Sequence, residues 1–270
     1  MKKRPFENMV VTVSGGACGI GRALCEKFGM EGAAIAFLDH NKKETAQTEN
    51  GLIEMGITAR GYHCDITIED ECSSVFKEII SQFGGIDILI NNAGITQRSP
   101  FVKTGTPVYR HVMDVNFFGA IHCTDFAMDS LIERKGMIIV TSSIAGLVPL
   151  LGRSGYSASK HALHGFFGTL RSELRQLGVH VMIVCPGFTK TNLQSSCLDG
   201  DGSVTGHRQS RVGKESTPAK VAEAVFRGAL KRKGLLVLSG IGKLSYIINR
   251  IFPSLYERLM ERNLKSEIDR

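Results

Sequence analysis

Seven short apolar runs that alternate with helix-length segments constrain the fold of this 270-residue chain more than any other feature. The runs lie at 9–14, 33–39, 57–65, 86–94, 136–143, 179–187 and 234–240. Several are apolar without alternation, which is typical of strands covered on both faces. Segments of helical length lie between them, for example 19–31, 68–83 and 154–177. Strand–helix alternation with right-handed crossovers predicts an α/β fold: a doubly wound parallel sheet of about seven strands with helices on both faces.

We recognise no internal repeat or linker, so we expect one domain over residues 1–270 with a core at about 7–240. Two regions break the alternation. Residues 192–216 are polar and rich in Gly and Ser, and a loop of this length predicts a flexible lid over a substrate. Residues 241–270 form an amphipathic extension in which Leu244, Ile247, Ile251 and Leu255 recur at helical spacing, with Pro253 as an interruption.

The net charge of +7 is compatible with an anionic partner, such as a nucleotide, a nucleic acid or an acidic membrane. No nucleic-acid-binding motif is present, so we expect no nucleic-acid partner. The seven cysteines are scattered and form no C-x-x-C pair, which indicates a reducing compartment rather than disulfides or zinc. The histidines form no metal-binding pattern, so we expect no metal.

No apolar run reaches the length of about 18 residues that a transmembrane helix needs. We therefore expect a cytoplasmic protein. The basic, apolar-faced extension leaves two possibilities open: peripheral membrane contact, or packing on its own core or on a partner subunit.

A glycine-rich turn, SGGACGIG, links the first predicted strand to the first helix and spans Ser14 to Gly21. Glycine lets a backbone turn tightly and approach a pyrophosphate, and the start of the next helix supplies free N–H groups. Asp39 ends the second run, where a carboxylate can bind ribose hydroxyls and repel a 2′-phosphate. This pattern favours NAD, although the nearby His40, Lys42 and Lys43 leave NADP open.

The stretch GYSASKHALHG, residues 155–165, supports two chemistries. Ser157 and Lys160 form an S-x-x-K motif, whereas Tyr156 and Lys160 lie one helical turn apart. The serine interpretation fails because its K-T-G companion occurs only earlier in the chain and no G-x-S-x-G is present. A tyrosine needs about 4 kcal/mol to titrate near neutral pH. An ammonium about 4 Å away supplies energy of that order at an effective dielectric near 20. The pattern favours Tyr156 as an acid/base, acidified by Lys160.

Taken in order, these motifs resemble the short-chain dehydrogenase/reductase family over about residues 7–240. The matching residues are the turn 14–21 (with Ser14 where Thr is usual), Asp65 in CDIT, Asn91-Asn92-Ala93-Gly94, Asn116 in DVNFFG, Ser143 in TSSIAG, Tyr156-x-x-x-Lys160, and Pro186-Gly187-Phe188-Thr189-Lys190-Thr191. The resemblance implies a Rossmann-type fold, a nicotinamide cofactor and alcohol/carbonyl redox chemistry.

The resemblance also implies the roles of individual residues. Tyr156 would be the acid/base, Lys160 would hold the nicotinamide ribose, Ser143 would bind the substrate oxygen, and Asn116 would anchor a water that links the lysine to solvent. The implied cofactor-binding residues are Ser14, Gly15, Gly19, Ile20, Gly21, Asp39, Asp65, Asn91, Ala93, Gly94, Tyr156, Lys160, Pro186, Gly187 and Thr191.

We therefore expect an oxidoreductase that transfers a hydride between NAD, or NADP, and a secondary alcohol or ketone, as a homodimer or homotetramer. The apolar loop 146–152 favours a steroid-, lipid- or 3-oxoacyl-like substrate. Arg98, Arg153 and Arg208 offer an alternative, a grip on a carboxylate or phosphate, although loop arginines are commonly solvated. A catalytically silent NAD(H) sensor is the alternative function, and the intact serine, tyrosine and lysine set disfavours it.

Overall fold

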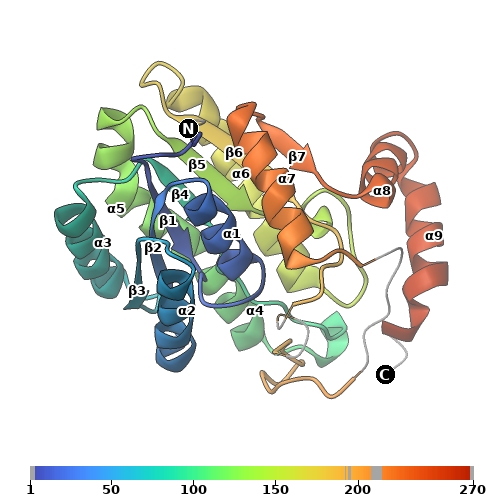
Figure 1. The fold of residues 1–270 in the computed structure, drawn as a ribbon. Helices are drawn as coiled ribbons and strands as arrows, with labels where there is room; N and C mark the ends of the chain where they lie inside the picture. The colour runs from blue at the N-terminus through green and yellow to red at the C-terminus, as the bar shows by residue number, and fades with distance from the viewer. Residues whose placement is uncertain (1–3, 192, 194–195, 208–214, 268–270) are drawn as a thin grey trace.

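The sheet of the computed structural model consists of seven parallel strands in the order β3-β2-β1-β4-β5-β6-β7 (Figure 1), counted over the described residues 4–191, 193, 196–207 and 215–267. The strands are β1 (Val10–Ser14), β2 (Ala34–Asp39), β3 (Ala59–His63), β4 (Ile88–Asn91), β5 (Met137–Thr141), β6 (His180–Cys185) and β7 (Leu235–Val237). Each lies inside one of the seven apolar runs. The predicted fold class is therefore confirmed.

Helices cover both faces of the sheet (Figure 1). One face carries α1 (Gly19–Met30), α2 (Lys42–Glu54) and α7 (Pro218–Leu230), and the other carries α3 (Glu69–Phe83), α5 (Gly119–Glu133) and α6 (Ser154–Glu173). The central strands are fully buried, as at Val11, Leu89 and Ile139. This burial on both faces explains why the runs are apolar without alternation.

The connection from β3 to β4 crosses over β1, so the direction of strand order reverses between β1 and β4. Loops that leave these two strands diverge at their carboxyl ends. In open α/β sheets a ligand binds in the crevice at such a reversal. The topology therefore places the glycine turn after β1 and the Asn-Asn-Ala-Gly segment after β4 beside one another. A short helix, α4 (Thr106–Met113), packs on α6 at the same end.

The C-terminal extension forms two helices, α8 (Gly240–Ile251) and α9 (Pro253–Leu264), followed by a 3-10 turn, Lys265–Glu267. Pro253 is the first residue of α9, where the missing N–H of proline breaks no helical hydrogen bond. The pair lies at one side of the molecule beyond β7 (Figure 1). The Tyr256 hydroxyl donates to the Pro149 carbonyl at 3.0 Å, so α9 is fastened to the loop before α6. No helix among the described residues has the length and apolarity needed to cross a membrane.

The polar segment 192–216 is described at Leu193, 196–207 and 215–216. Backbone hydrogen bonds fasten its first part to the loop after β4: Leu198 N–H donates to Thr96 O at 2.9 Å, and Arg98 N–H donates to Leu198 O at 2.8 Å. Residues 192, 194–195 and 208–214, including Arg208, lie outside the described residues. The flexibility of this lid stays a prediction.

Candidate active site

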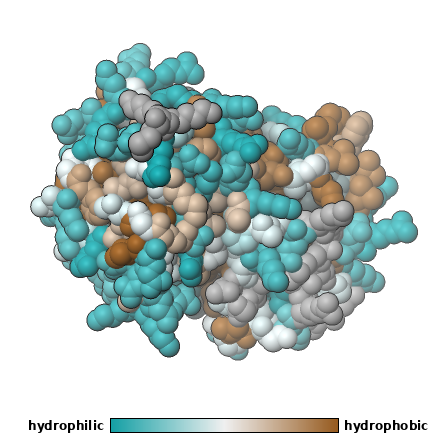
Figure 2. All heavy atoms as spheres, viewed as in Figure 1, coloured by the Kyte–Doolittle hydropathy of each residue, from teal (hydrophilic) through white to brown (hydrophobic). Residues whose placement is uncertain are grey.

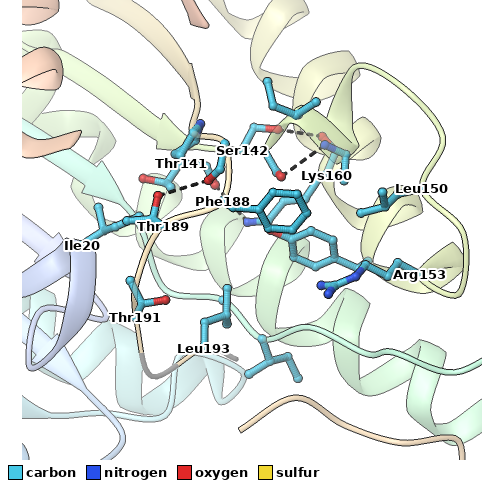
Figure 3. A pocket seen from close by; sticks show the side chains of 18 of the residues that line it. Ile20, Thr141, Ser142, Leu150, Arg153, Lys160, Phe188, Thr189, Thr191 and Leu193 are labelled. Carbon is cyan, nitrogen blue, oxygen red and sulfur yellow. Dashed lines mark hydrogen bonds between the residues drawn. The ribbon is translucent and has the colours of Figure 1, made fainter. Parts of the chain in front are cut away.

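The carboxyl ends of the strands open into a cavity of about 1100 Å³. Figure 3 shows side chains that line it: Ile20 and Thr191 lie on the side of the glycine turn, Leu150 and Arg153 lie on the opposite side, and Phe188 lies between them. The loops after β1, β2, β4, β5 and β6 all contribute to the lining, and so do α8 and α9. One cavity therefore joins the predicted nucleotide site to the predicted catalytic residues.

The glycine turn has the conformation that its sequence predicts. Gly15 and Gly19 have φ values of +65° and +55°, which residues with a side chain rarely adopt. A Cβ on Gly15 would lie 2.7 Å from the Ala93 Cα, so the loops after β1 and β4 approach at backbone distance. Helix α1 begins at Gly19, and its N-cap Cys18 makes no side-chain capping bond. The first N–H groups of α1 therefore have no side-chain acceptor from the cap, which suits an anion.

Three predicted cofactor residues do not line the cavity: Ser14, Gly21 and Asn91. Ser14 and Gly21 belong to the turn itself, whereas Asn91 lies at the end of β4. The Ser14 Oγ accepts from the backbone N–H of Asn92 at 3.1 Å and of Ala93 at 3.2 Å. Gly21 faces the Gly15 carbonyl so closely that a Cβ would collide with it. The Asn91 Nδ2 donates to Thr124 Oγ1 at 2.8 Å.

Three carboxylate side chains, those of Asp39, Glu44 and Asp65, line the end of the cavity beside β2 and β3. The Asp39 Oδ2 accepts from Ala17 N–H at 3.2 Å and its Oδ1 accepts from Asn41 N–H at 3.1 Å, so the backbone orients the group. The Asp65 Oδ1 accepts from the Thr67 N–H at 2.9 Å. Neither Lys42 nor Lys43 lines the cavity, whereas His40 does, with its Nδ1 3.3 Å from the Asp39 Oδ1. The two lysines that could bind a 2′-phosphate thus lie outside the lining, and the Asp39 carboxylate lies where ribose hydroxyls could bind.

Ser143 and Tyr156 meet in the cavity from two different elements. Ser143 follows β5 in extended conformation, and its Oγ accepts from the Ala145 N–H at 3.2 Å, which starts a short 3-10 turn. Tyr156 lies in the first turn of α6, where its N–H donates to Gln97 Oε1 at 3.1 Å. The neighbouring Ser142 also lines the cavity, but its hydroxyl donates to Lys160 O at 3.2 Å. The choice of Ser143 as the substrate-binding serine fits this geometry.

Lys160 and Tyr156 face the same cavity from adjacent turns of α6. The Lys160 Nζ lies 5.8 Å from the centre of the Tyr156 ring and donates to the Thr141 carbonyl at 2.9 Å. Burial raises the pKa of Tyr156, against the opposing effects of a hydrogen bond with Ser143 and the charge of Arg153. Burial also lowers the pKa of Lys160 to about 8. Burial thus outweighs the effects that favour the phenolate when the cavity holds only the chain itself, and the acidification of Tyr156 by Lys160 stays a prediction.

Asn116 lies in a π-helical turn, Asp114–Phe118, between α4 and α5, and it does not line the cavity. Its Oδ1 accepts from Ile95 N–H at 2.8 Å, and its Nδ2 donates to Ile95 O and to Ser159 Oγ, both at 2.9 Å. A Cβ on Gly94 would lie 3.0 Å from this Oδ1 and 3.4 Å from the Lys160 Nζ. Asn116 and Lys160 thus flank one small space, as a shared water would require.

The remaining predicted cofactor residues line the cavity: Gly15, Gly19, Ile20, Asp39, Asp65, Ala93, Gly94, Tyr156, Lys160, Pro186, Gly187 and Thr191. Among the described residues, no three His, Cys, Asp or Glu side chains gather in a way that could hold a metal ion.

The sequence did not reveal two parts of the lining. Side chains of α8 and α9, including Ile241, Leu244 and Leu259, form one wall of the cavity. The helical spacing of the extension indicated an apolar face but not where it packs. Arg98 and Arg153 are 3% and 5% exposed, which corrects the expectation that loop arginines are solvated. An arginine placed just before a helix that carries the catalytic tyrosine was the available signal.

The comparison with protein families decides the classification. A model of the short chain dehydrogenase family matches residues 9–201. The chain belongs to the short chain dehydrogenase family. As a short chain dehydrogenase, it is an oxidoreductase enzyme.

Relatives and solved structures agree with this classification. The chain is 33% identical over 270 residues to dehydrogenase/reductase SDR family member 7B of Xenopus tropicalis, covering 97% of this chain and 87% of that protein. It is 30% identical over 276 residues to the protein of the same name from Danio rerio, covering 99% and 89%. A short chain dehydrogenase/reductase from Burkholderia phymatum, solved in complex with NAD, superposes with a TM-score of 0.83 at 22% identity, covering 94% of this chain and 96% of that one.

Proposed function

We propose that this short chain dehydrogenase transfers a hydride between NAD and a secondary alcohol or ketone, with Tyr156 as the acid/base. One observation carries the proposal: Ser143, Tyr156 and Lys160 line the same cavity as the glycine turn and Asp39. Hydride transfer requires a cofactor beside the reacting carbon and a proton-transferring group beside the oxygen on that carbon. A cavity with only one of these two sets would fit a binding protein, whereas this cavity has both.

The residues of the cavity fit a dinucleotide. Gly15 and Gly19 leave room for a pyrophosphate at the start of α1, and Asp39 supplies the acceptor for a ribose with free hydroxyls. Thr191 lines the cavity next to the turn, since a Cβ placed on Gly19 would lie 3.4 Å from the Thr191 Cβ. The Burkholderia phymatum relative was solved with NAD, and we infer the same cofactor here, with NADP disfavoured by Asp39.

The nicotinamide, when bound, supplies or accepts the hydride. The chain supplies the proton: the Tyr156 hydroxyl donates its proton to the carbonyl oxygen during reduction, and the Tyr156 phenolate takes up the proton of the alcohol during oxidation. Ser143 hydrogen-bonds the same oxygen and holds it beside the phenol. Because burial raises the pKa of Tyr156, the phenol keeps its proton near neutral pH and is set as a proton donor. The Lys160 Nζ donates to the Thr141 carbonyl and lies between Tyr156 and Gly94. In this position its ammonium can bind a ribose and return a proton to the phenolate after reduction.

An activity panel tests the proposal. Secondary alcohols, both medium-chain alkyl alcohols and hydroxysteroids, are assayed with NAD and NADP, and the matching ketones are assayed with NADH and NADPH. Nucleotide binding is measured separately by calorimetry. We expect turnover with at least one alcohol or ketone pair and a preference for NAD. Binding of NAD with no turnover of any pair would contradict the proposal and would favour an NAD(H) sensor.

We also propose that the exposed apolar face of α8 and α9 contacts an anionic membrane surface, in an otherwise cytoplasmic protein. The exposed fractions of Ile247, Ile251 and Phe252 are 53%, 61% and 59%, and Figure 2 shows apolar atoms gathered over α8. Lys243 and Arg250 lie on the same helix and complement anionic headgroups. Co-sedimentation with phosphatidylserine and phosphatidylcholine vesicles should show binding to the anionic vesicles only. Equal recovery of wild type and I251S/F252S in the supernatant would refute this contact.

For the subunit number we propose a homodimer or homotetramer. The outer face of α6 supports it, since a Cβ on Gly165 or Gly168 would have no described atom within 4 Å. An exposed helical glycine costs roughly 1 kcal/mol relative to alanine, so this bare face suits the close approach of another helix. Sedimentation equilibrium should give two or four chains, and a monomer at micromolar concentration would contradict the proposal.

A further inference from the structure

Arg153 is a buried cation with its side chain in the substrate half of the cavity. It precedes α6 as the N-cap residue, is 5% exposed, and lines the cavity beside Leu150 (Figure 3). Its Nη1 donates to the Thr96 Oγ1 at 3.1 Å. The guanidinium carries five N–H donors, and within the described part of the chain this bond to Thr96 is the one that it makes. Most of its donor capacity is therefore directed at the cavity.

The charges around Arg153 do not balance within the described residues. Arg98 and Glu267 are the neighbouring charged groups, and the Arg98 Nε lies 3.8 Å from the Glu267 Oε2, with both side chains 3% exposed. The Cys197 thiol is also near, but burial raises its pKa, so it carries no charge at neutral pH. Two guanidinium groups thus share one carboxylate. A buried charge without a full partner is costly, and an anionic ligand would remove the imbalance.

The position of Arg153 relative to the reacting groups limits which ligand can supply that anion. Tyr156 lies three residues further along α6, and the charge of Arg153 acts on its hydroxyl. A group bound by Arg153 therefore lies close to a carbonyl that is bound by Tyr156 and Ser143. The adjoining wall is apolar, formed by Val148, Leu150 and Phe188. The site thus combines one cation near the reaction centre with an apolar surface beyond it.

We propose that Arg153 determines specificity by binding a carboxylate or phosphate of the substrate, so that the enzyme takes hydroxy acids or hydroxyalkyl phosphates, and the matching ketones, with an apolar chain. The proposal rests on the proposed dehydrogenase function. A carboxylate and a phosphate each present two anionic oxygens side by side, and a guanidinium can bind such a pair with two parallel hydrogen bonds. An arginine suits this role better than a lysine because its donors are fixed in a fork.

The test compares three alcohols that share a pentyl chain and a CHOH–CH2 unit and differ in the group attached to it: 3-hydroxyoctanoate, its methyl ester, and 2-hydroxyheptyl phosphate, each assayed with NAD. For Arg153→Gln, the ratio of kcat/KM for the better anionic alcohol to that for the ester should fall about 10- to 100-fold. Arg153→Lys should retain part of the preference. The matched control is Arg175→Gln, an exposed arginine just beyond the end of α6, which should leave the ratio unchanged. Comparison of the two anionic alcohols identifies whether carboxylate or phosphate is preferred.

A binding measurement keeps the outcome independent of turnover. Octanoate, octyl phosphate and octanol are titrated by calorimetry into wild type and Arg153→Gln in the presence of NAD. The better anion should bind wild type at least about tenfold more tightly than it binds the variant, with octanol unchanged. Equal anion affinity in the two proteins, or an unchanged kcat/KM ratio, would overturn the role of Arg153. Anion binding without turnover of any alcohol would overturn the dehydrogenase function and leave the anion site standing.

Discussion

Lys160→Met should stabilise the protein at neutral pH while it removes activity. The Lys160 ammonium is 3% exposed, and burial lowers its pKa from an ordinary value of 10.5 to about 8. This difference corresponds to a penalty of about 3 kcal/mol for holding the charged form in the folded protein. Methionine removes that penalty and loses the hydrogen bond to Thr141 O, worth about 1 kcal/mol. We expect a net gain of about 2 kcal/mol at pH 7.

The pH dependence of this gain distinguishes charge from packing. Below pH 8 the lysine is charged in both the folded and the unfolded state, and the folded state carries the full penalty. Between about pH 8 and 10.5 the folded state loses its proton first, so wild-type stability rises with pH relative to the variant. By pH 10 the penalty falls below about 1 kcal/mol. The advantage of the methionine should then vanish.

The assay is thermal unfolding of nucleotide-free wild type and Lys160→Met, followed by circular dichroism at pH 7 and pH 10. The variant should melt about 4 to 8 °C higher at pH 7, and the two proteins should melt together at pH 10. Lys77→Met, at an exposed position of α3, controls for the loss of a lysine in general and should show no such change with pH. A lower melting temperature for Lys160→Met at pH 7, or a gain that is equal at both pH values, would refute the reasoning.

Two further substitutions test the nucleotide end of the cavity. Asp39→Asn removes a negative charge beside the ribose site while keeping one acceptor for the Ala17 N–H. The ratio of kcat/KM for NADP to that for NAD should therefore rise at least about tenfold. An unchanged ratio in steady-state kinetics would show that Asp39 does not determine cofactor choice. Gly21→Ala places a methyl group against the Gly15 carbonyl, so it should lower stability by about 1–3 kcal/mol and weaken NAD binding in calorimetry. Its control is Gly51→Ala in α2, where the nearest atom, Arg22 Nη2, lies 3.6 Å from the added Cβ. This substitution should raise the free energy of unfolding by up to about 1 kcal/mol. Similar melting temperatures for the two variants would contradict the role of Gly21.

The fold could be predicted from the sequence because the signals are local and consistent. Each strand coincides with an apolar run that the sheet buries on both faces, and the glycine turn needs positive φ values that few other residues accept. The order of the motifs predicted that Ser143, Tyr156 and Lys160 share one site, and all three line one cavity. They do so because the carboxyl ends of parallel strands lie at one edge of the sheet.

The failures concern burial and long-range packing, which sequence spacing does not report. The sequence shows that Tyr156 and Lys160 lie one helical turn apart, but it does not show that the chain buries both groups and that Lys160 donates to Thr141. Arg153 appeared to be a loop cation because nothing local shows that α9 and Glu267 cover that loop. The destination of α8 and α9 depends on contacts more than a hundred residues apart, such as Tyr256 with Pro149.

The proton transfer by Tyr156 is tested most directly by Tyr156→Phe, with NADH binding and ketone reduction measured on the same preparation. Reduction is followed with the best ketone from the activity panel at saturating NADH. We expect kcat to fall by about 100- to 10,000-fold, the usual effect of removing a general acid, while the Kd for NADH changes less than about threefold. A variant that reduces the ketone at the wild-type rate would contradict the assignment of Tyr156 as the acid/base.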